Sequence, residues 1–478
     1  MLLLQPFLRQ CRHRPEATAL VENDRCLSYG DLLARAQSVA AGLQGLGVQP
    51  GRPVAVHLER GIDAVIALFG VLLAGACYVP LDLKNPKPRL ASIIDDARVH
   101  AIVGLGAAPA WLDANLWLDL AACSENALKP VETSADALAA ILYTSGSTGQ
   151  ARGVALSHRA IASFTRWASD LLALQNNDRI AASAPFFFDL STFDLYAVLG
   201  AGASLYFIPS SLNLAPARLS AWLQEHAING WYTVPSLLAF LAYKGNLAQT
   251  PLESLRFLIF AGEVFPAPAL INLATCLPRT ALYNFFGPTE TNVCCYWPVE
   301  RERLSADDNI PIGLPAANYQ LHLQAETGEL WARGPSLADG YWNQGRLQPF
   351  LNEAGWYPTG DRVSLTDGEY RFHGRLGRML KCSGYRVEPA EIEAVVNAMT
   401  GVIDCAVVGI DDPAAGQRPA LALVLESQTP LAEIRSALIR QLPSYMQPNR
   451  CIVLEQLPRL PNGKLDYRQV RALLETQP

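Results

Sequence analysis

Strand-like and helix-like segments alternate along most of this 478-residue sequence. Short apolar runs bounded by Gly or Pro have the pattern of buried strands, and segments with helical spacing of apolar residues separate them. The strand candidates before residue 263 are 52–58, 77–81, 100–105, 179–185, 204–209, 230–235 and 255–262. This alternation predicts α/β units in which helices cover buried sheets. The chain is longer than one hydrophobic core usually supports, so we expect two or more domains.

The pattern changes twice toward the C-terminus. From about residue 310 the strands become shorter and turns become frequent, which predicts a smaller β-rich subdomain. A new series of strands and helices begins after Arg378. We therefore expect a large N-terminal domain over 1–376 and a compact α+β domain over 377–478, with the boundary in the polar stretch 374–381.

One segment, Ala64–Leu81, carries no charge over about the length that could span a bilayer. Gly75 and Pro80 interrupt it, and its last residues have the character of a strand. The segment therefore predicts a buried helix followed by a buried strand, and no membrane anchor.

Composition indicates the cellular compartment and excludes some classes of binding partner. The ten cysteines are scattered without a Cys-x-x-Cys pair, which is typical of reduced thiols in a cytoplasmic protein. Residues 1–16 lack the basic region and the long apolar core of a signal peptide. The net charge is −6 and no basic cluster is present to neutralise phosphates. We expect a cytoplasmic protein that binds neither membranes nor nucleic acid.

A loop rich in glycine and hydroxyl groups follows an apolar run. After Ala140–Tyr143, the segment Thr144–Gly149 contains four hydroxyls and two glycines in six residues. Unobstructed backbone N–H groups and hydroxyl donors suit a chain of phosphates. A Walker-type loop would end in Gly-Lys-Ser or Gly-Lys-Thr, but here the sequence continues Gly-Gln-Ala-Arg. The loop alone favours phosphate binding of another kind, and leaves open a surface loop without a ligand.

Nine short stretches along nearly the whole chain favour the phosphate-binding loop over a surface loop without a ligand. They resemble the motifs of one superfamily and occur in the same order. The sequence resembles the adenylate-forming superfamily, which includes the adenylation domains of nonribosomal peptide synthetases. The stretches are 27–32, 72–82, 143–153, 285–290, 328–334, 357–361, 374–393, 442–448 and 460–466. The residue types in Cys77–Asp82 and Asn462–Asp466 resemble those of the peptide-synthetase branch.

The resemblance implies the superfamily fold, which is a large N-terminal domain of α/β subdomains plus a β-rich subdomain, followed by a small mobile α+β domain. It also implies ATP and Mg²⁺. Asp361 matches the position that binds the ribose hydroxyls, and Phe286 replaces the usual adenine-stacking Tyr. The full set of matching nucleotide positions is Thr144, Ser145, Gly146, Ser147, Thr148, Gly149, Arg152, Gly262, Glu263, Asn284, Phe285, Phe286, Gly287, Asp361 and Arg375.

Three residues match positions that the family uses in the reaction itself. The resemblance implies that Thr289 contacts the α-phosphate, that Glu290 holds Mg²⁺, and that Lys464 bridges the substrate carboxylate and the phosphate. Attack of a carboxylate on the α-phosphorus concentrates negative charge in the transition state, so donors and cations at these positions suit that chemistry.

Two positions depart from the family pattern. The usual Pro-Lys-Gly after the phosphate loop is Ala151-Arg152-Gly153, in which Arg152 keeps the positive charge. The hinge about which the family rotates its C-terminal domain is Gly377 in place of Asp or Lys. Glycine permits large changes of backbone angles, so rotation remains expected without a gating side chain.

The substrate positions indicate an apolar amino acid. Asp189 matches the carboxylate that holds the substrate α-ammonium, and with Lys464 it would bind both ends of an amino acid. The matching side-chain pocket contains no acid or base, and consists of Leu190, Phe193, Tyr232, Ile259, Ala261, Phe285, Val293 and Cys294. This set resembles the L-proline pattern of stand-alone L-prolyl-carrier-protein ligases. Phe285 and Ile259 stand where leucines are usual, which leaves pipecolate, a substituted proline or a small aliphatic residue open.

The resemblance also implies a partner. No phosphopantetheine-attachment motif follows Lys464, so we expect a free-standing enzyme that loads a separate carrier protein. An acyl- or aryl-CoA ligase of the same superfamily is the nearest alternative, and it would not need Asp189. A nucleotide-binding regulatory protein that has lost catalysis is a further alternative, against which the presence of Lys464, Glu290 and Asp361 argues.

Overall fold

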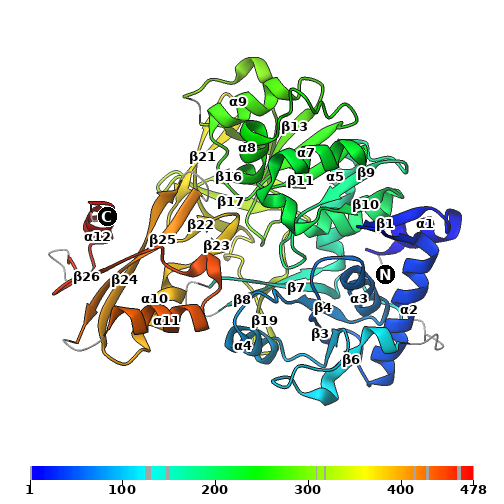
Figure 1. Cartoon of the computed structure of the whole chain (residues 1–478), viewed down its shortest axis with the longest axis horizontal. Helices are drawn as coiled ribbons and strands as arrows, with labels where there is room; N and C mark the ends of the chain where they lie inside the picture. The colour runs from blue at the N-terminus through cyan, green and yellow to red at the C-terminus, as the bar shows by residue number, and fades with distance from the viewer. Residues whose placement is uncertain are drawn as a thin grey trace. The chain divides into compact units, whose positions relative to one another are not determined.

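The computed structural model describes residues 3–123, 131–146, 151–307, 309–316, 319–412, 416–426, 430–459 and 465–476. The chain forms two compact units, coloured along the sequence in Figure 1. Unit 1 comprises Met1–Asp82, Ile94–Leu142 and Gly153–Gly374. Unit 2 comprises Leu83–Ile93, Tyr143–Arg152 and Arg375–Pro478. The two units therefore divide between Gly374 and Arg375 in the last part of the chain.

The larger sheet contains 13 strands of the described chain, and its centre is parallel. Strands β10, β9, β11, β12 and β13 run in one direction, whereas β14 is antiparallel to β13. In order across the sheet, the strands are β16 (Gln320–Leu323), β17 (Glu329–Arg333), β20 (Tyr357–Thr366), β21 (Glu369–Arg375), β15 (Pro311–Pro315), β14 (Cys295–Pro298), β13 (Ala281–Phe286), β12 (Phe257–Phe260), β11 (Gly230–Thr233), β9 (Arg179–Ala182), β10 (Ser204–Phe207), β1 (Thr18–Glu22) and β2 (Arg25–Ser28).

Helices cover both faces of the parallel strands. Leu258 and Phe260 of β12 pack into one hydrophobic cluster with α7 (Pro216–Glu225), α8 (Pro235–Lys244) and α9 (Ala267–Cys276), the helices at the top of Figure 1. Phe257 and Ile259 belong to the cluster of the opposite face, together with residues of α5 (His158–Leu172) and of the π-helical segment Phe193–Val198. Successive residues of a strand point to opposite faces, so each strand contributes to both cores.

The second sheet of unit 1 has eight strands among the described residues, of which β4, β3, β5 and β6 are parallel neighbours. The predicted buried helix and strand are confirmed as α3 (Ile62–Leu73) and β4 (Cys77–Pro80), and α3 packs against α2 (Tyr29–Gly45). Within the described residues, no helix is both long enough and apolar enough to cross a membrane. The order of the sheet is β19 (Arg346–Gln348), β18 (Gly340–Asn343), β8 (Arg152–Ser157), β7 (Leu138–Thr144), β4, β3 (Pro53–Val56), β5 (Ala101–Gly104) and β6 (Trp117–Asp119).

Local sequence explains where these helices begin. Ser28 is the N-cap of α2, and its hydroxyl accepts from the Asp31 N–H at 3.1 Å. Ser157 caps α5 in the same way by accepting from the Ala160 N–H. A capping hydroxyl stabilises a helix by about 1 kcal/mol because it satisfies an otherwise unpaired backbone donor. The remaining helices before Glu388 are α1 (Gln5–His13), α4 (Lys87–Ala97) and α6 (Leu199–Ala201).

Unit 2 contains a separate mixed sheet with a hydrophobic cluster on each face. Cys405 and Val407 of β24 pack in the cluster that contains residues of α10 (Pro389–Asn397) and α11 (Leu431–Gln441). Ala406 and Val408 of the same strand pack in the cluster that contains residues of α12 (Tyr467–Thr476). The strands are β23 (Tyr385–Val387), β22 (Leu380–Cys382), β25 (Gly416–Leu425) and β24 (Val402–Asp412), with β26 (Arg450–Val453) beside β25. The predicted combination of a large α/β part and a small α+β part is confirmed.

Candidate active site

Most of the predicted site residues of unit 1 follow the carboxyl ends of the parallel strands. Asp189 and Leu190 follow β9, Ala261 follows β12, and Gly287 begins the turn after β13. In open parallel sheets, ligands bind at this edge because the loops that follow the strands converge there. The topology therefore brings side chains from three separate loops to one edge of the larger sheet.

The predicted substrate pocket is largely brought together by the fold. Six of its positions share one hydrophobic cluster, and Leu190 packs against that cluster as a half-buried side chain. Cys294 is also buried, but it belongs to a different cluster together with Phe286. The six positions are Phe193, Tyr232, Ile259, Ala261, Phe285 and Val293.

Aromatic rings make edge contacts across this pocket. The rings of Phe193 and Tyr232 have their centroids 5.7 Å apart at 82°, and those of Tyr232 and Phe285 are 5.7 Å apart at 75°. Edge-to-face pairs of this kind place the positive ring edge on the negative ring face. Tyr232, Ile259 and Phe285 come from neighbouring strands and lie on the same face of the sheet, so the pocket wall is part of a regular sheet surface.

Asp189 lies in a half-buried position next to these apolar side chains. Burial raises the pKa of its carboxyl to about 6, even though a hydrogen bond with the Thr289 side chain lowers it. The nearby carboxylate of Glu290 raises the pKa further. Removing a carboxylate from water disfavours its charged form, so a cation placed against Asp189 would relieve this cost. Asp189 is therefore suited to bind an ammonium group.

The turn from β13 to β14 is tight and carries two of the predicted catalytic residues. Its backbone closes through hydrogen bonds from Thr291 N–H to Pro288 O and from Cys294 N–H to Phe286 O, at 2.8 and 2.9 Å. A Cβ on Gly287 would lie 2.3 Å from Asn292 O and 2.6 Å from Thr291 Oγ1. Only glycine fits this close approach without a shift of the turn that presents Thr289 and Glu290.

We expect Gly287→Ala to lower the thermal unfolding midpoint by several degrees. The added methyl group forces the backbone of the turn to move, and overpacking of this kind costs about 1–3 kcal/mol. The measurement is a calorimetric or fluorescence melt. Gly45→Ala is the matched control, because a Cβ at Gly45 would meet nothing within 4 Å. Equal melting behaviour of Gly287→Ala and the wild type would show that the turn tolerates a side chain.

Glu290 is fully buried, and a tyrosine fixes its carboxylate. The Tyr341 hydroxyl, from β18, donates to Glu290 Oε1 at 2.8 Å, and the Ala338 N–H donates to the Glu290 backbone carbonyl. Across the parts of the chain that the structure describes, no three His, Cys, Asp or Glu residues form a group that could hold a metal ion. A single buried carboxylate suits Mg²⁺ that arrives already coordinated by phosphates, because Mg²⁺ is often bound by one or two carboxylates and substrate phosphates.

Asp361 is held rigidly in β20. Its side chain is 1% exposed, and its N–H donates to Thr359 Oγ1, which in turn donates to the carbonyl of Leu330. The side chain of Asn284 in β13 bonds to the backbone of a neighbouring strand, because its Nδ2 donates to Pro311 O at 2.7 Å. Phe286 lies 5.5 Å from Phe372, ring centroid to centroid. These three predicted nucleotide residues all lie in strands of the larger sheet or at its strand ends.

Glu263 has a structural role in the described chain. Its carboxylate accepts from the Ser236 N–H at 2.8 Å and from the Ser236 hydroxyl at 3.2 Å, so it caps the first turn of α8. The preceding Gly262 has φ of +90°, a backbone conformation that favours glycine. The Gly262-Glu263 step therefore reverses the chain after β12 and fixes its end to the neighbouring helix.

The remaining described predictions lie in unit 2. Thr144 ends β7 and donates to Arg152 O at 3.5 Å, while the Ser145 hydroxyl donates to Arg386 O at 2.5 Å. Gly146 backbone N–H contacts Glu391, whose carboxylate also pairs with Arg89. The start of the glycine-rich loop is thus bonded to Arg386, which precedes α10, and to Glu391 in the first turn of α10.

The other predicted residues lie at the boundary between the units or outside the described residues. Arg375 is the last residue of β21. A Cβ on Gly377 would meet nothing within 4 Å, so packing does not require glycine there. Ser147–Gly149 and Lys464 lie outside the residues that the structure describes.

One buried acid near Tyr232, Asp194, was not identified from the sequence. Asp194 is fully buried in the π-helical segment, and neither carboxylate oxygen has a hydrogen-bond partner among the described protein atoms. Burial raises the pKa of Asp194, and the Arg60 guanidinium lowers it. Arg60 donates to the carbonyls of Ala182 and Ile208, at the ends of β9 and β10. The acid follows Phe193 in the motif, but its Arg60 neighbour is far away in the sequence, so no local signal could reveal it.

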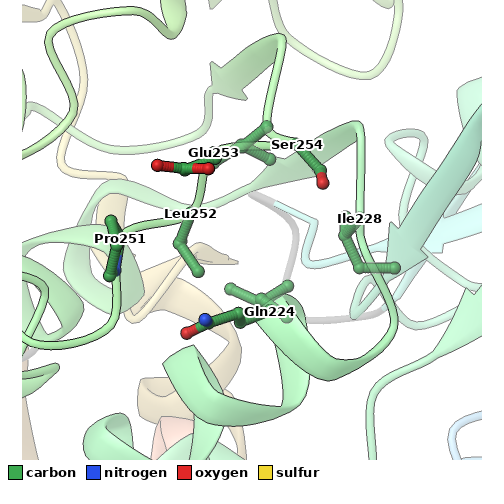
Figure 2. Close-up of a pocket in the computed structure, with 8 residues that line it drawn as sticks. Gln224, Ile228, Pro251, Leu252, Glu253 and Ser254 are labelled. Carbon is green, nitrogen blue, oxygen red and sulfur yellow. The ribbon is translucent and has the colours of Figure 1, made fainter.

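A cavity of about 390 Å³ lies elsewhere in unit 1 (Figure 2). It is lined by Ile228, which precedes β11, by Leu255, which precedes β12, and by side chains of α7. This is the amino edge of the parallel strands, opposite to the edge where the predicted residues converge. Its labelled polar side chains, Gln224, Glu253 and Ser254, are exposed. None of the predicted site residues lines this cavity, so it is not part of the candidate active site.

Comparisons with known proteins agree along almost the whole chain. The sequence pattern of the AMP-binding enzyme family matches residues 7–342, and that of the AMP-binding enzyme C-terminal domain matches residues 391–464. An L-proline--[L-prolyl-carrier protein] ligase of Streptomyces coelicolor is 37% identical over 490 residues, which cover 93% of this chain and 91% of the relative. A ligase of the same description from Pseudomonas fluorescens is 34% identical over 501 residues, which cover 97% and 98%.

A solved structure shows the same fold. The amide bond synthetase McbA from Marinactinospora thermotolerans superimposes with a TM-score of 0.86 and covers 98% of this chain and 99% of its own. Its sequence identity is 20%, so the likeness concerns the fold alone. The expected fold of adenylate-forming enzymes is thereby confirmed.

Proposed function

Because the chain belongs to the family of AMP-binding enzymes, we propose that it uses ATP to activate L-proline as the prolyl-adenylate. The proline carboxylate attacks the α-phosphorus of ATP and pyrophosphate leaves. In a second step the thiol of a carrier protein's phosphopantetheine attacks the acyl carbon, and AMP leaves. The product is a thioester, so the enzyme is an AMP-forming ligase that makes a carbon–sulfur bond.

One observation supports the proposal that the substrate is an amino acid. Asp189 is a half-buried carboxylate with a pKa raised to about 6, and it stands beside an apolar pocket at the carboxyl edge of the parallel strands. None of the eight pocket positions bears a charge, so nothing in the pocket itself neutralises Asp189. A substrate α-ammonium would supply the missing positive charge, whereas a simple carboxylic acid would leave a buried charge unpaired.

The choice of proline rests on the pocket and on the relatives. Seven of the eight pocket side chains are apolar or aromatic and buried, and the exception, Leu190, is half-buried. The two relatives described above are named for L-proline, and each covers more than nine-tenths of this chain. A pyrrolidine ring has no polar side-chain group that would need a partner in such a pocket. We propose that Leu190, Phe193, Tyr232, Ile259, Ala261, Phe285, Val293 and Cys294 form the side-chain pocket.

The first step, formation of the prolyl-adenylate, requires groups that stabilise the negative charge developing on the α-phosphate. We propose that Thr289 contacts that phosphate and that the buried Glu290 carboxylate would hold Mg²⁺ carried by ATP. The Tyr341 hydroxyl orients this carboxylate through its 2.8 Å hydrogen bond to Oε1. Mg²⁺, when bound, draws negative charge from the phosphate oxygens and so favours departure of pyrophosphate. Donors that are fixed in place before the reaction avoid the cost of reorganising during it.

The other nucleotide contacts extend the proposal to the ribose and the phosphate chain. Asp361, whose backbone is fixed by Thr359, would accept from the ribose hydroxyls. The glycine-rich loop 144–149 with Arg152 would hold the outer phosphates, and Lys464 would bridge the proline carboxylate and the α-phosphate. Phe286 would stack on the adenine, and the positions around it would complete the nucleotide site. These are Gly262, Glu263, Asn284, Phe285, Gly287 and Arg375.

We also propose how the chain is organised for its two half-reactions. Residues 1–376 would carry the ATP and amino-acid site, and residues 377–478 would form a mobile domain that brings Lys464. Gly377 would act as the hinge, because a glycine with open space around it accepts large backbone rotations. The acceptor would be a separate carrier protein in the cytoplasm.

The experiment that tests this function is amino-acid-dependent exchange between ATP and labelled pyrophosphate. The panel contains the proteinogenic amino acids, pipecolate and substituted prolines. We expect the strongest exchange with L-proline and little with charged amino acids. Strong exchange with another amino acid would refute the assignment of proline, and exchange only with acids that lack an α-amine would refute amino-acid activation.

The pKa of Asp189 predicts how the reaction depends on pH. In the free enzyme the carboxyl is protonated below a pH of about 6, because burial raises its pKa, and a neutral carboxyl cannot pair with the ammonium. We therefore expect kcat/KM for L-proline to fall about tenfold per pH unit below that value, since the ionised fraction falls by that factor.

At saturating proline the bound ammonium favours the ionised carboxylate, so the corresponding fall in kcat should move to lower pH. The measurement is a pair of pH profiles for pyrophosphate exchange, one of kcat/KM and one of kcat. Identical profiles, with no loss of kcat/KM near pH 6, would contradict the role of Asp189 as the ammonium partner.

A further inference from the structure

A tryptophan outside the predicted pocket contacts one of its walls. Trp167 lies on α5, and its ring centroid is 5.1 Å from that of Phe285, with 39° between the ring planes. The same indole stands edge-on to Tyr296 of β14, at 5.3 Å and 75°. Trp167 is half-buried and packs against the cluster that contains the pocket residues. Helix α5 thus places a large rigid ring directly behind a pocket side chain.

These contacts complete a row of four rings. Trp167 contacts Phe285, Phe285 contacts Tyr232 at 5.7 Å, and Tyr232 contacts Phe193 at 5.7 Å. The four rings come from four different elements, α5, β13, β11 and the segment Phe193–Val198. A fifth ring, Tyr283, lies 6.4 Å from Phe285 on the same strand. Phe285 is fully buried and contacts both Trp167 and Tyr232.

We propose that Trp167 determines the size of substrate ring that the enzyme accepts, because it fixes Phe285 in its position in the pocket wall. This inference rests on the proposed activation of a cyclic amino acid. Trp167 does not itself line the predicted pocket, so its effect would pass through Phe285. A close-packed interior resists movement of a buried ring that neighbouring rings contact. Phe285 would accordingly set a firm limit on the space available beside Tyr232.

Removal of the indole should relax this limit in a defined direction. Trp167→Ala leaves a space behind Phe285 into which its ring can turn, which enlarges the substrate side of the pocket. Pipecolate has one methylene group more than proline, and one methylene is worth about 1–3 kcal/mol of discrimination in an apolar pocket. We expect the ratio of kcat/KM for pipecolate to that for L-proline to rise about tenfold or more in Trp167→Ala.

Two further variants separate this role from general destabilisation. Trp167→Phe keeps a ring behind Phe285, and we expect a selectivity ratio between those of the wild type and Trp167→Ala. Trp222→Ala is the matched control, since Trp222 is also a half-buried helical tryptophan of unit 1 but packs against the other hydrophobic cluster. We expect Trp222→Ala to keep the wild-type ratio. If Trp167→Ala does not fold, Trp167→Phe carries the test alone.

The measurement is kcat/KM for both amino acids by pyrophosphate exchange, for each variant. A purely structural role of Trp167 would lower both values by the same factor, and an unchanged ratio in Trp167→Ala or Trp167→Phe would overturn the inference. The wild type separates this failure from failure of the proposed function. If the wild type activates another amino acid best, the ratio is measured between that amino acid and its homologue with one more methylene. If it activates none, the function and this inference are both overturned.

Discussion

Asp189→Ala should lower kcat/KM for L-proline in pyrophosphate exchange by a hundredfold or more, about 2–5 kcal/mol of lost transition-state stabilisation. The variant removes the proposed partner of the substrate ammonium and leaves that charge in an apolar pocket. Removal of one partner of a buried charge pair is costly because the other charge stays desolvated. The KM for ATP should change less than kcat/KM for L-proline, since of the two substrates Asp189 is proposed to contact only the amino acid.

Protein stability provides an internal check on this result. Burial raises the pKa of Asp189, so its charged form is unfavourable in the free enzyme, and its removal should not lower the unfolding midpoint. Asp24→Asn is the matched control, because Asp24 is an exposed carboxylate in the turn between β1 and β2 and should be silent in both assays. A variant that melts normally and still activates proline at the wild-type rate would refute the ammonium site.

Lys464→Ala should reduce prolyl-adenylate formation by about a hundredfold to a thousandfold, the usual effect of losing one group that stabilises developing charge. The proposed role of this lysine is confined to the first half-reaction, where it bridges the carboxylate and the α-phosphate. Transfer from chemically synthesised prolyl-adenylate to a carrier protein should therefore continue at close to the wild-type rate. The two half-reactions are measured separately, by pyrophosphate exchange and by mass spectrometry of the carrier.

Lys244→Ala is the control for this experiment. Lys244 is an exposed lysine in the last turn of α8, so its removal takes away the same charge without touching the proposed site. We expect wild-type rates in both half-reactions for this variant. An equal loss of both half-reactions in Lys464→Ala would show that the lysine supports the fold or the whole cycle rather than adenylate formation.

The sequence indicates much of the fold because local signals and burial agree. Gly75 ends the apolar helix before it could span a bilayer, and α3 and β4 lie within the expected segment. The hydroxyl of Ser28 marks the start of α2, and the helix ends at Gly45. Gly47 follows the helix end with φ of +80°, a conformation that favours glycine.

The grouping of the candidate residues follows from the topology, because residues that follow parallel strands converge on one edge of the sheet. What could not be predicted are contacts between residues that are distant in the sequence. Tyr341 is 51 residues from Glu290, and nothing near either residue indicates their hydrogen bond. The carboxylate of Glu263 caps α8 through Ser236, which no motif reveals. A motif identifies the residue that bears a charge, but contacts formed in the folded chain determine which neighbours orient that residue.

The two acids of residues 189–194 illustrate the same limit. Asp189 precedes the π-helical segment and Asp194 is its second residue. Apolar residues neighbour both acids in the sequence. In the structure Asp189 is half-buried beside Thr289, while Asp194 is fully buried near Arg60. Only the three-dimensional arrangement shows which acid is half-buried beside Thr289 and which is fully buried near Arg60.

The most direct test of amino-acid activation compares L-proline with cyclopentanecarboxylate in pyrophosphate exchange by the wild-type enzyme. The two acids have rings of the same size, but only proline carries the amine that Asp189 is proposed to bind. We expect strong exchange with L-proline and none with cyclopentanecarboxylate at the same concentration. Equal exchange with the two acids would contradict the proposed ammonium site, and would assign the enzyme to the ligases that activate simple carboxylic acids.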